Sequence, residues 1–360
     1  MMPKVALIYL SFKSGKYLSE ALNTIKSVRY PRDRFELVIV DNKVPGDDSA
    51  AVIKATVLPR SGVDLPKITL LENPDNLGFA GGMNTGMKFA LENVFDYVML
   101  LNQDGEVDSG IIENAVRVAE ADLKIGAVQC LIRLHPETHL LNGYGNELHY
   151  LGLGWSGGYR LKVHDARPTL VHEIGYASGA AVLYRASALR DVGIFDEVMF
   201  LYHEDTDLSV RMRLRNWRIV IAPRSDFYHK YEFTRSIMSY YWMLRNQLVL
   251  FFTLPKKRTI LLLLPMQIVL NSATLLFSFK GGWWRQSLRA YGFFLKPSTW
   301  KYLAKRRREI QLVRLMSDRE AYAICKSEVV FQDVDNWLLR HVGNPMMRLY
   351  WKIAYPLMRW

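Results

Sequence analysis

The sequence predicts an α/β fold with a mostly parallel central sheet, followed by a basic helical region. Almost wholly apolar runs at residues 5–10, 35–40 and 97–101 are typical of parallel strands that are buried on both faces. Between the first two runs, Leu18 and Leu22 follow the spacing of a helix. A strand, a helix and a second strand at this spacing indicate a parallel βαβ unit.

Charge divides the 360-residue chain into two parts. Residues 1–230 contain 26 Lys and Arg against 28 Asp and Glu, whereas residues 231–360 contain 21 against 7. Half of all residues are hydrophobic, which excludes a disordered chain and allows one large domain or two ordinary ones. We therefore expect a globular domain followed by a region that meets a polyanion.

The cysteines indicate a reducing compartment. Cys130 and Cys325 lie far apart and have no metal-like spacing, and the N-terminus lacks the pattern of a signal peptide. The sequence therefore predicts a cytoplasmic protein.

Two carboxylates follow predicted strands directly. Asp41 comes after the run at residues 35–40, and Asp104 comes after the run at residues 97–101. In open α/β sheets, ligands bind at the carboxyl edge of the strands. Both side chains are therefore expected at a binding site.

A glycine-rich segment lies between these carboxylates, at residues 73–86. Its glycines, Gly78, Gly81, Gly82 and Gly86, open a predicted helix and would let backbone N–H groups approach an anion. The spacing matches neither a P-loop nor the dinucleotide fingerprint. The alternative is a flexible loop with a helix cap.

An acidic cluster opens the helix predicted within residues 200–217. Glu204, Asp205 and Asp207 all fall in its first turn. They form either a catalytic site or an ordinary complement to the helix dipole, and Asp207 can pair with Arg211 one turn on.

Two further segments have distinct patterns. Residues 130–175 combine glycines with aromatic residues, which indicates either a mobile lid over a sugar or an irregular β excursion. Residues 217–222 predict a strand that is closed by Pro223.

Residues 259–279 contain no charged residue and are long enough to cross a bilayer. Positive residues at 256–258 and from Lys280 onward flank both ends, so a hairpin or an in-plane pair of helices broken near Pro265 fits better than one crossing. Aromatic residues near Arg285 suit the headgroup depth, and the basic cluster at 305–308 is expected to attract anionic lipid rather than nucleic acid.

Several short motifs in the first two thirds together resemble the inverting glycosyltransferases of family 2, which have the GT-A fold, and especially bacterial rhamnosyl- and galactofuranosyltransferases. The resemblance covers about residues 4–232, in the family's order. The motifs that carry the resemblance are residues 40–42, 76–86, 101–104, 177–180, 193–197, 202–208 and 228–229.

The resemblance implies a role for each matching residue. Asp205 would be the general base, with Glu204 beside it, and Asp104 and His229 would bind Mg²⁺ or Mn²⁺, although a structural histidine is the alternative. Ser178, Gly179 and Asp207 would contact the acceptor. The nucleotide-sugar would contact Ser11, Asp41, Asn42, Asn76, Gly78, Phe79, Gly81, Gly82, Asn84, Asn102 and Gln103.

These residue types suit the reaction. A divalent cation stabilises the charge that develops on a leaving nucleoside diphosphate, and a carboxylate can take the proton of the acceptor hydroxyl. Two features depart from the family: Asn102 replaces the first Asp of an Asp-x-Asp motif, and residues 10–14 lack the usual asparagine-containing turn.

The expected enzyme transfers a sugar, such as rhamnose, from a dTDP- or UDP-sugar to a polyprenyl-diphosphate-linked saccharide in cell-surface polysaccharide assembly, such as that of O-antigen. It would have a GT-A domain at 1–232, with a donor half at 1–105 and an acceptor half at 106–232. Residues 233–360 would attach it, as a monotopic or peripheral protein, to the cytoplasmic face of the cell membrane. The alternatives are a non-catalytic nucleotide-sugar binder, which Asn102 alone supports, and a sugar nucleotidyltransferase.

Overall fold

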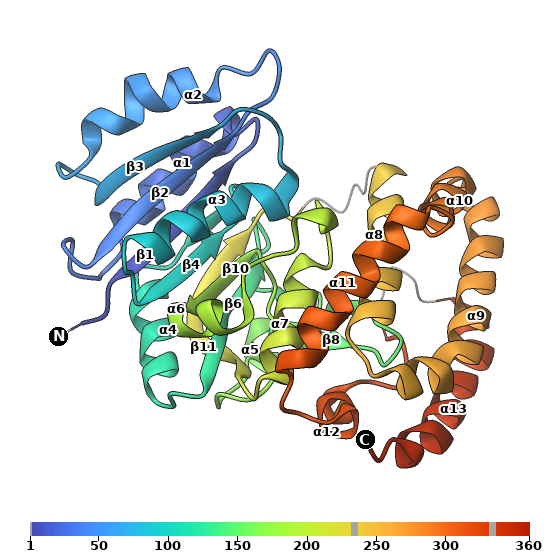
Figure 1. Cartoon of the computed structure of the whole chain (residues 1–360). Coiled ribbons are helices and arrows are strands. Elements are labelled where there is room, and N and C mark those ends of the chain that lie inside the picture. The colour runs from blue at the N-terminus through green and yellow to red at the C-terminus, as the bar shows by residue number, and fades with distance from the viewer. Residues whose placement is uncertain (1, 232–236, 331–335) are drawn as a thin grey trace.

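The computed structural model describes residues 2–231, 237–330 and 336–360. A sheet between two layers of helices makes up the first two thirds, and helices make up the last third (Figure 1). The boundary expected between residues 232 and 233 lies outside the described residues.

The central sheet is mixed. Its first four strands run parallel, the fifth is antiparallel to both neighbours, and the next two are parallel to each other. A short strand pairs with the last of these seven strands at the far edge of the sheet, and a second short strand pairs with the sixth. In spatial order the strands are β3 (Lys67–Asn73), β2 (Phe35–Asn42), β1 (Val5–Ser11), β4 (Tyr97–Leu101), β10 (Ala181–Arg185), β6 (Ile125–Leu134), β11 (Arg218–His229) and β5 (Gly105–Val107), with β7 (Leu141–Gly143) beside β6.

Helices cover both faces of this sheet. On one face, α1 (Gly15–Lys26) and α4 (Ile111–Glu120) pack on one set of alternate strand residues. The other face carries α3 (Gly78–Glu92), α6 (Ala186–Val192) and α7 (Glu204–Leu214). Every residue of β1 and β2 is buried, as the apolar runs predict. Each Leu, Ile or Val buried in this way contributes about 1.5–3 kcal/mol.

The glycine-rich segment opens a helix, as the sequence predicts. Helix α3 begins at Gly78, so the later glycines lie inside it. A Cβ on Gly82 would lie 2.5 Å from Leu10 Cδ1, and one on Gly86 would lie 2.7 Å from Ile8 Cγ2. Gly82 and Gly86 therefore let α3 pack closely on β1, and the approach of an anion to the start of this helix stays a prediction.

The strand predicted to close at Pro223 continues to His229. Its pairing with β6 shifts register between Ala222 and Asp226, and Pro223 lies within the shift. Because proline has no N–H group for the ladder, it is tolerated at such an irregularity. The continuation carries His229 to the same edge as the end of β4.

Residues 130–175 form an irregular β excursion, one of the two expected structures. After β6 and β7, the strands β8 (Asn146–Leu148) and β9 (Gly154–Ser156) pair with each other. The short helix α5 (Val163–Ala166) follows.

The described part of the last third consists mainly of helices that gather beside the sheet domain (Figure 1). They are α8 (Ile237–Thr253), α9 (Lys257–Lys280), α10 (Trp284–Phe293), α11 (Pro297–Val313), α12 (Asp318–Ala321) and α13 (Asn344–Leu357).

The break expected near Pro265 is absent, because α9 is a single 24-residue helix. Proline removes one backbone hydrogen bond and disfavours a helix interior. Packing holds the helix on both sides of the proline, since Leu263 and Met266 share a hydrophobic cluster with Phe251 of α8 and Met347 of α13.

The basic cluster at 305–308 is only partly at the surface, and its attraction to anionic lipid stays a prediction. Lys305 and Arg308 are exposed, but Arg306 points inward. Its guanidinium lies 3.1 Å from Asp207 Oδ2 and 3.1 Å from Asp196 Oδ2. Helix α11 is therefore joined to the sheet domain by partly buried ion pairs.

Candidate active site

Two side chains meet at the carboxyl edge of β1 and β2. Ser11 Oγ donates to Asp41 Oδ1 at 3.5 Å, and Asp41 is only 6% exposed. Burial, together with the charges of Asp47 and Glu72, raises the pKa of Asp41. The sheet thus presents a desolvated carboxyl group where the nucleotide was expected.

Asn42 organises the turn before α3. Its Nδ2 donates to Asn76 Oδ1 and to the carbonyl oxygen of Gly78, both at 3.0 Å. Its Oδ1 accepts from the backbone N–H of Leu77 at 3.0 Å. Only 2% of Asn42 is exposed, so its side chain holds the predicted donor-binding turn from the protein interior.

The start of α3 touches the approach to α7. Gly78 has a φ of +70°, and a Cβ at this position would lie 2.5 Å from the carbonyl oxygen of Phe200. The same oxygen accepts from Ala80 N at 3.1 Å. A glycine is therefore required here for both conformation and close approach.

Several other predicted donor residues contact the protein itself. Asn84 is 1% exposed, and its amide pairs with both backbone groups of Phe195, at 3.0 and 3.1 Å. The amide of Gln103 pairs in the same way with Phe12, at 2.7 and 2.8 Å. These contacts favour positioning roles, and donor binding by either residue stays a prediction.

Phe79 and Gly81 lie in the first turn of α3. The ring of Phe79 is 6.2 Å from that of Phe195, and a Cβ on Gly179 would lie 3.0 Å from its edge. A Cβ on Gly81 would lie 2.7 Å from Leu77 Cβ, so this glycine relieves crowding within the turn.

The predicted metal ligands come together at the ends of β4 and β11. His229 Nε2 lies 3.2 Å from Asp104 Oδ1 and 3.4 Å from Asn102 Nδ2. On the other side of the ring, Nδ1 lies 2.9 Å from Asn142 Oδ1. Because an amide oxygen only accepts, Nδ1 donates to Asn142, and Nε2 faces Asp104 and Asn102.

This donor set suits a hard divalent cation that takes its remaining ligands from phosphate and water. Across residues 2–231, 237–330 and 336–360, no group of three or more His, Cys, Asp or Glu side chains could hold a metal alone. Asn142, which fixes the imidazole, was not predicted, because it is a lone polar residue in the irregular segment.

The acidic cluster contacts the segment that precedes β10. Asp205 Oδ2 accepts from Gly179 N at 3.0 Å, and its Oδ1 accepts from Thr206 N at 2.7 Å and Thr206 Oγ1 at 3.2 Å. Ser178 N donates to Gln129 Oε1 at 2.9 Å, which fixes this segment to the sheet. The structure thus brings together the predicted residues Ser178, Gly179 and Asp205.

The two carboxyl groups at the helix start have different environments. Glu204 is 4% exposed, and burial together with the charge of Asp205 raises its pKa well above the ordinary value. Burial also raises the pKa of Asp205, but the Gly179 and Thr206 N–H groups oppose that change. The N–H groups of Gly179 and Thr206 therefore favour the negative charge on Asp205, whereas burial favours the neutral form of Glu204.

Asp207 is engaged in a buried ion-pair network. It is 1% exposed and accepts from Arg211 Nε at 2.7 Å and from Arg306 at 3.1 Å. Burial alone would raise its pKa, but the two guanidinium charges hold the pKa below its ordinary value. The predicted pairing with Arg211 is confirmed, and its contact with an acceptor stays a prediction.

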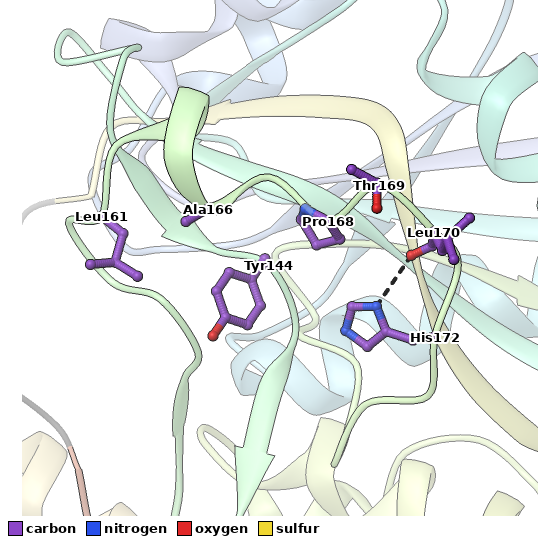
Figure 2. Close-up of a pocket in the computed structure, with 7 residues that line it drawn as sticks. All are labelled: Tyr144, Leu161, Ala166, Pro168, Thr169, Leu170 and His172. Atoms are coloured by element: carbon purple, nitrogen blue, oxygen red, sulfur yellow. Dashed lines mark hydrogen bonds between the residues drawn. The ribbon is translucent and has the colours of Figure 1, made fainter.

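A shallow pocket of about 400 Å³ lies elsewhere on the surface. Figure 2 shows that Tyr144 and His172 line it, with His172 Nδ1 lying 3.2 Å from the carbonyl oxygen of Leu170. It contains none of the predicted site residues, and its lining has no carboxylate. This pocket is therefore separate from the candidate site at the strand edge.

Solved structures with a similar fold are GT-A glycosyltransferases. Mannosyltransferase PcManGT from Pyrobaculum calidifontis aligns with a TM-score of 0.51 and 17% identity, covering 87% of this chain and 86% of its own. Staphylococcus aureus TarS aligns with a TM-score of 0.51 and 18% identity, covering 98% of this chain and 54% of its own. The fold is accordingly GT-A.

The sequence comparison then gives the family. The family described as "Glycosyltransferase like family 2" matches residues 3–247, and the chain belongs to it. An N-acetylglucosaminyl-diphospho-decaprenol L-rhamnosyltransferase of Mycobacterium tuberculosis is 26% identical over 64% of this chain and 76% of its own length. A poly-beta-1,6-N-acetyl-D-glucosamine synthase of Staphylococcus aureus is also 26% identical, but the alignment spans only 48% of that enzyme. The protein is a family 2 glycosyltransferase.

Proposed function

We propose that this glycosyltransferase moves a sugar, with inversion, from a nucleoside diphosphate to a saccharide linked to polyprenyl diphosphate. The observation that carries the proposal is the acidic pair at the start of α7, in which the N–H groups of Gly179 and Thr206 hold the Asp205 carboxyl group beside the buried Glu204. The rhamnosyltransferase relative supports rhamnose as the sugar and a polyprenyl-linked acceptor.

The donor would lie along the carboxyl ends of β1, β2 and β4. Asp41 accepts hydrogen bonds from the nucleoside, while the turn fixed by Asn42 lines the sugar and phosphates. Asp104 and His229 would hold Mg²⁺ or Mn²⁺, which supplies positive charge to the departing diphosphate. Manganese is present in the PcManGT structure named above, which supports a divalent cation.

Asp205 takes the proton of the acceptor hydroxyl as that oxygen attacks the anomeric carbon. Its raised pKa suits this role, because a base is most effective when its pKa approaches the working pH. Attack from the face opposite the diphosphate inverts the anomeric configuration. Burial raises the pKa of Glu204 well above its ordinary value, and in its protonated form this side chain can donate a hydrogen bond that orients the acceptor.

A panel of nucleotide-sugars tests the proposal. We expect purified protein to release nucleoside diphosphate with one dTDP- or UDP-sugar only when a polyprenyl-diphosphate saccharide is present. A coupled assay for the free diphosphate measures this rate. Binding of a donor without any release, in folded protein with acceptor present, would support the non-catalytic binder instead.

We also propose that α9 and α13 together contact the cytoplasmic face of the membrane. The two helices lie side by side, and the Tyr350 hydroxyl of α13 donates to the Leu262 carbonyl of α9 (Figure 1). Among the described residues, α9 alone is long and apolar enough to span a bilayer, and only 17% of its most apolar window is buried. Outward-facing Leu276 and Leu349 are 71% and 61% exposed.

Replacing both Leu276 and Leu349 with Glu should weaken binding to anionic vesicles at least about a hundredfold, because each leucine loses about 1.5–3 kcal/mol of burial in lipid. Vesicle sedimentation measures the change, and raising the salt concentration should weaken wild-type binding as well. The control replaces Val63 and Leu123, which are 80% and 73% exposed on the sheet domain, with Glu. Equal binding by both double variants would exclude this face.

A further inference from the structure

The backbone just before the acidic cluster has an unusual conformation. We call residues 198–203 the approach turn. Phe200, Tyr202 and His203 in this turn have φ values of 60°, 67° and 68°. Residues with side chains rarely adopt this left-handed region, and they persist there only when the surrounding structure holds them. The contacts that hold the turn therefore decide where Glu204 and Asp205 point.

One side chain of α8 binds most of the turn. Asn246 Nδ2 donates to the carbonyl oxygens of Met199, Leu201 and Tyr202, at 2.9, 2.9 and 2.7 Å. Asn246 is completely buried. A single amide group thus binds carbonyl oxygens on both sides of Phe200. These bonds hold Phe200 in a backbone conformation that it would otherwise avoid.

Arg245 fixes the direction of that amide. Its guanidinium donates to Asn246 Oδ1 through Nε at 2.8 Å and through a terminal nitrogen at 2.6 Å. The same terminal nitrogen donates to the Met199 carbonyl at 3.1 Å. Because a guanidinium only donates, it selects the amide orientation in which Nδ2 faces the turn.

Aromatic stacking completes the contact. The ring of Phe200 stacks on Trp242, also in α8, with centroids 4.8 Å apart, and Arg245 lies 4.4 Å from the centre of the Trp242 ring. The Phe200 carbonyl also accepts from Ala80 N at the start of α3. The approach turn therefore links α8 with both the predicted donor-binding turn before α3 and the acidic cluster.

We propose that Arg245 and Asn246 are positioning residues for transfer, which set the place of Asp205 by clamping the approach turn. This inference rests on the proposed function, in which Asp205 is the base. Neither side chain touches the reacting atoms. The helical region accordingly contributes to the active site and does more than attach the enzyme to a membrane.

Gln247 provides a matched control. It follows Asn246 in α8, is 2% exposed, and its amide also joins α8 to the sheet domain, through the Leu151 carbonyl. It also contacts Gln267 of α9, at 3.2 Å. Its partners lie outside the approach turn, so Gln247→Ala removes a comparable buried contact without releasing Asp205.

The experiment compares full-length wild type, Asn246→Ala and Gln247→Ala by kinetics and by amide hydrogen exchange. We expect Asn246→Ala to lower kcat about a hundredfold with little change in donor KM, because a displacement of about 1 Å has such an effect. Exchange over residues 198–208 should become at least about tenfold faster. Gln247→Ala should keep kcat within about threefold and leave exchange in this segment unchanged.

Equal losses of kcat in the two variants, or unchanged exchange over residues 198–208 in Asn246→Ala, would overturn the inference. If Asn246→Ala does not fold, Asn246→Ser is tested instead, because it keeps one shorter hydrogen-bond donor. This variant should still lose at least about tenfold in kcat. A wild-type kcat in Asn246→Ser would overturn the inference. The wild type could lack transfer activity while exchange over residues 198–208 is still faster in Asn246→Ala than in Gln247→Ala. That result would refute the proposed function and support the role of Asn246 in holding the approach turn.

Discussion

Replacing Asp205 with Asn should slow sugar transfer by about two to four orders of magnitude, the usual contribution of a general base. An amide cannot accept the acceptor's proton. Donor affinity should stay nearly unchanged, because in our proposal Asp205 contacts the acceptor rather than the nucleotide. Steady-state kinetics at saturating acceptor, with calorimetric measurement of donor binding, separates the two quantities.

Two neighbouring carboxyl groups serve as controls for this result. Burial favours the neutral form of Glu204 by raising its pKa, and Glu204→Gln supplies a neutral group of similar shape, so it should cost far less activity than Asp205→Asn. Asp207→Asn should chiefly lower stability, by about 3–5 kcal/mol, because it leaves buried guanidinium charges without their partner. Near wild-type turnover in Asp205→Asn would place the base elsewhere.

The same reasoning fixes a pH dependence. A base must be ionised to accept a proton, so kcat/KM falls as the pH drops through its pKa. Because burial raises the pKa of Asp205, this loss should begin at a higher pH than for an ordinary aspartate. The acid limb of the pH–rate profile should be missing in Asp205→Asn.

Replacing Asp104 with Ala should lower kcat/KM about a thousandfold, because metal stabilisation of a leaving diphosphate amounts to several kcal/mol. Unlike Asp205→Asn, this change should also weaken donor binding, since the phosphates lose their link to the protein. Wild-type enzyme treated with a chelator should behave in the same way. Electron paramagnetic resonance of Mn²⁺ with nucleoside diphosphate measures metal binding independently of activity.

Glu106→Gln is the matched control for charge. Glu106 lies two residues beyond Asp104 and pairs with Lys230 at 3.2 Å. It should leave Mn²⁺ binding within about twofold of wild type, because its charge lies outside the proposed site. Full wild-type activity in chelator would show that the loop from Asn102 to Asp104 serves a metal-free site.

The sequence was sufficient to predict the sheet edge and the residues on it. Apolar runs of strand length identified β1, β2 and β4, and parallel pairing places the carboxyl ends of such strands together. Asp41 and Asp104 could therefore be assigned to this edge before any coordinates. The acidic cluster was equally visible, since three carboxylates in four residues are a local pattern.

Contacts between distant segments could not be predicted in this way. Asn142 contacts His229, and Asn246 binds the approach turn. In the sequence, each is a single polar residue that belongs to no recognisable motif. Arg306 lies in a basic run that resembles a solvated surface, because charged residues are seldom buried unless they are paired. Its partners, Asp196 and Asp207, become apparent only when α11 is placed against the sheet domain.

The ion pair between Arg306 and Asp207 also bears on how the chain is made. The two residues are 99 positions apart, so at about 5–20 residues per second Asp207 leaves the ribosome roughly 5–20 s before Arg306. During that interval Asp207 has only Arg211 as a partner, and the apolar helix α9 emerges before α11 can dock. The nascent sheet domain therefore lacks this ion pair at a time when α9, which we propose contacts the membrane, has already been synthesised.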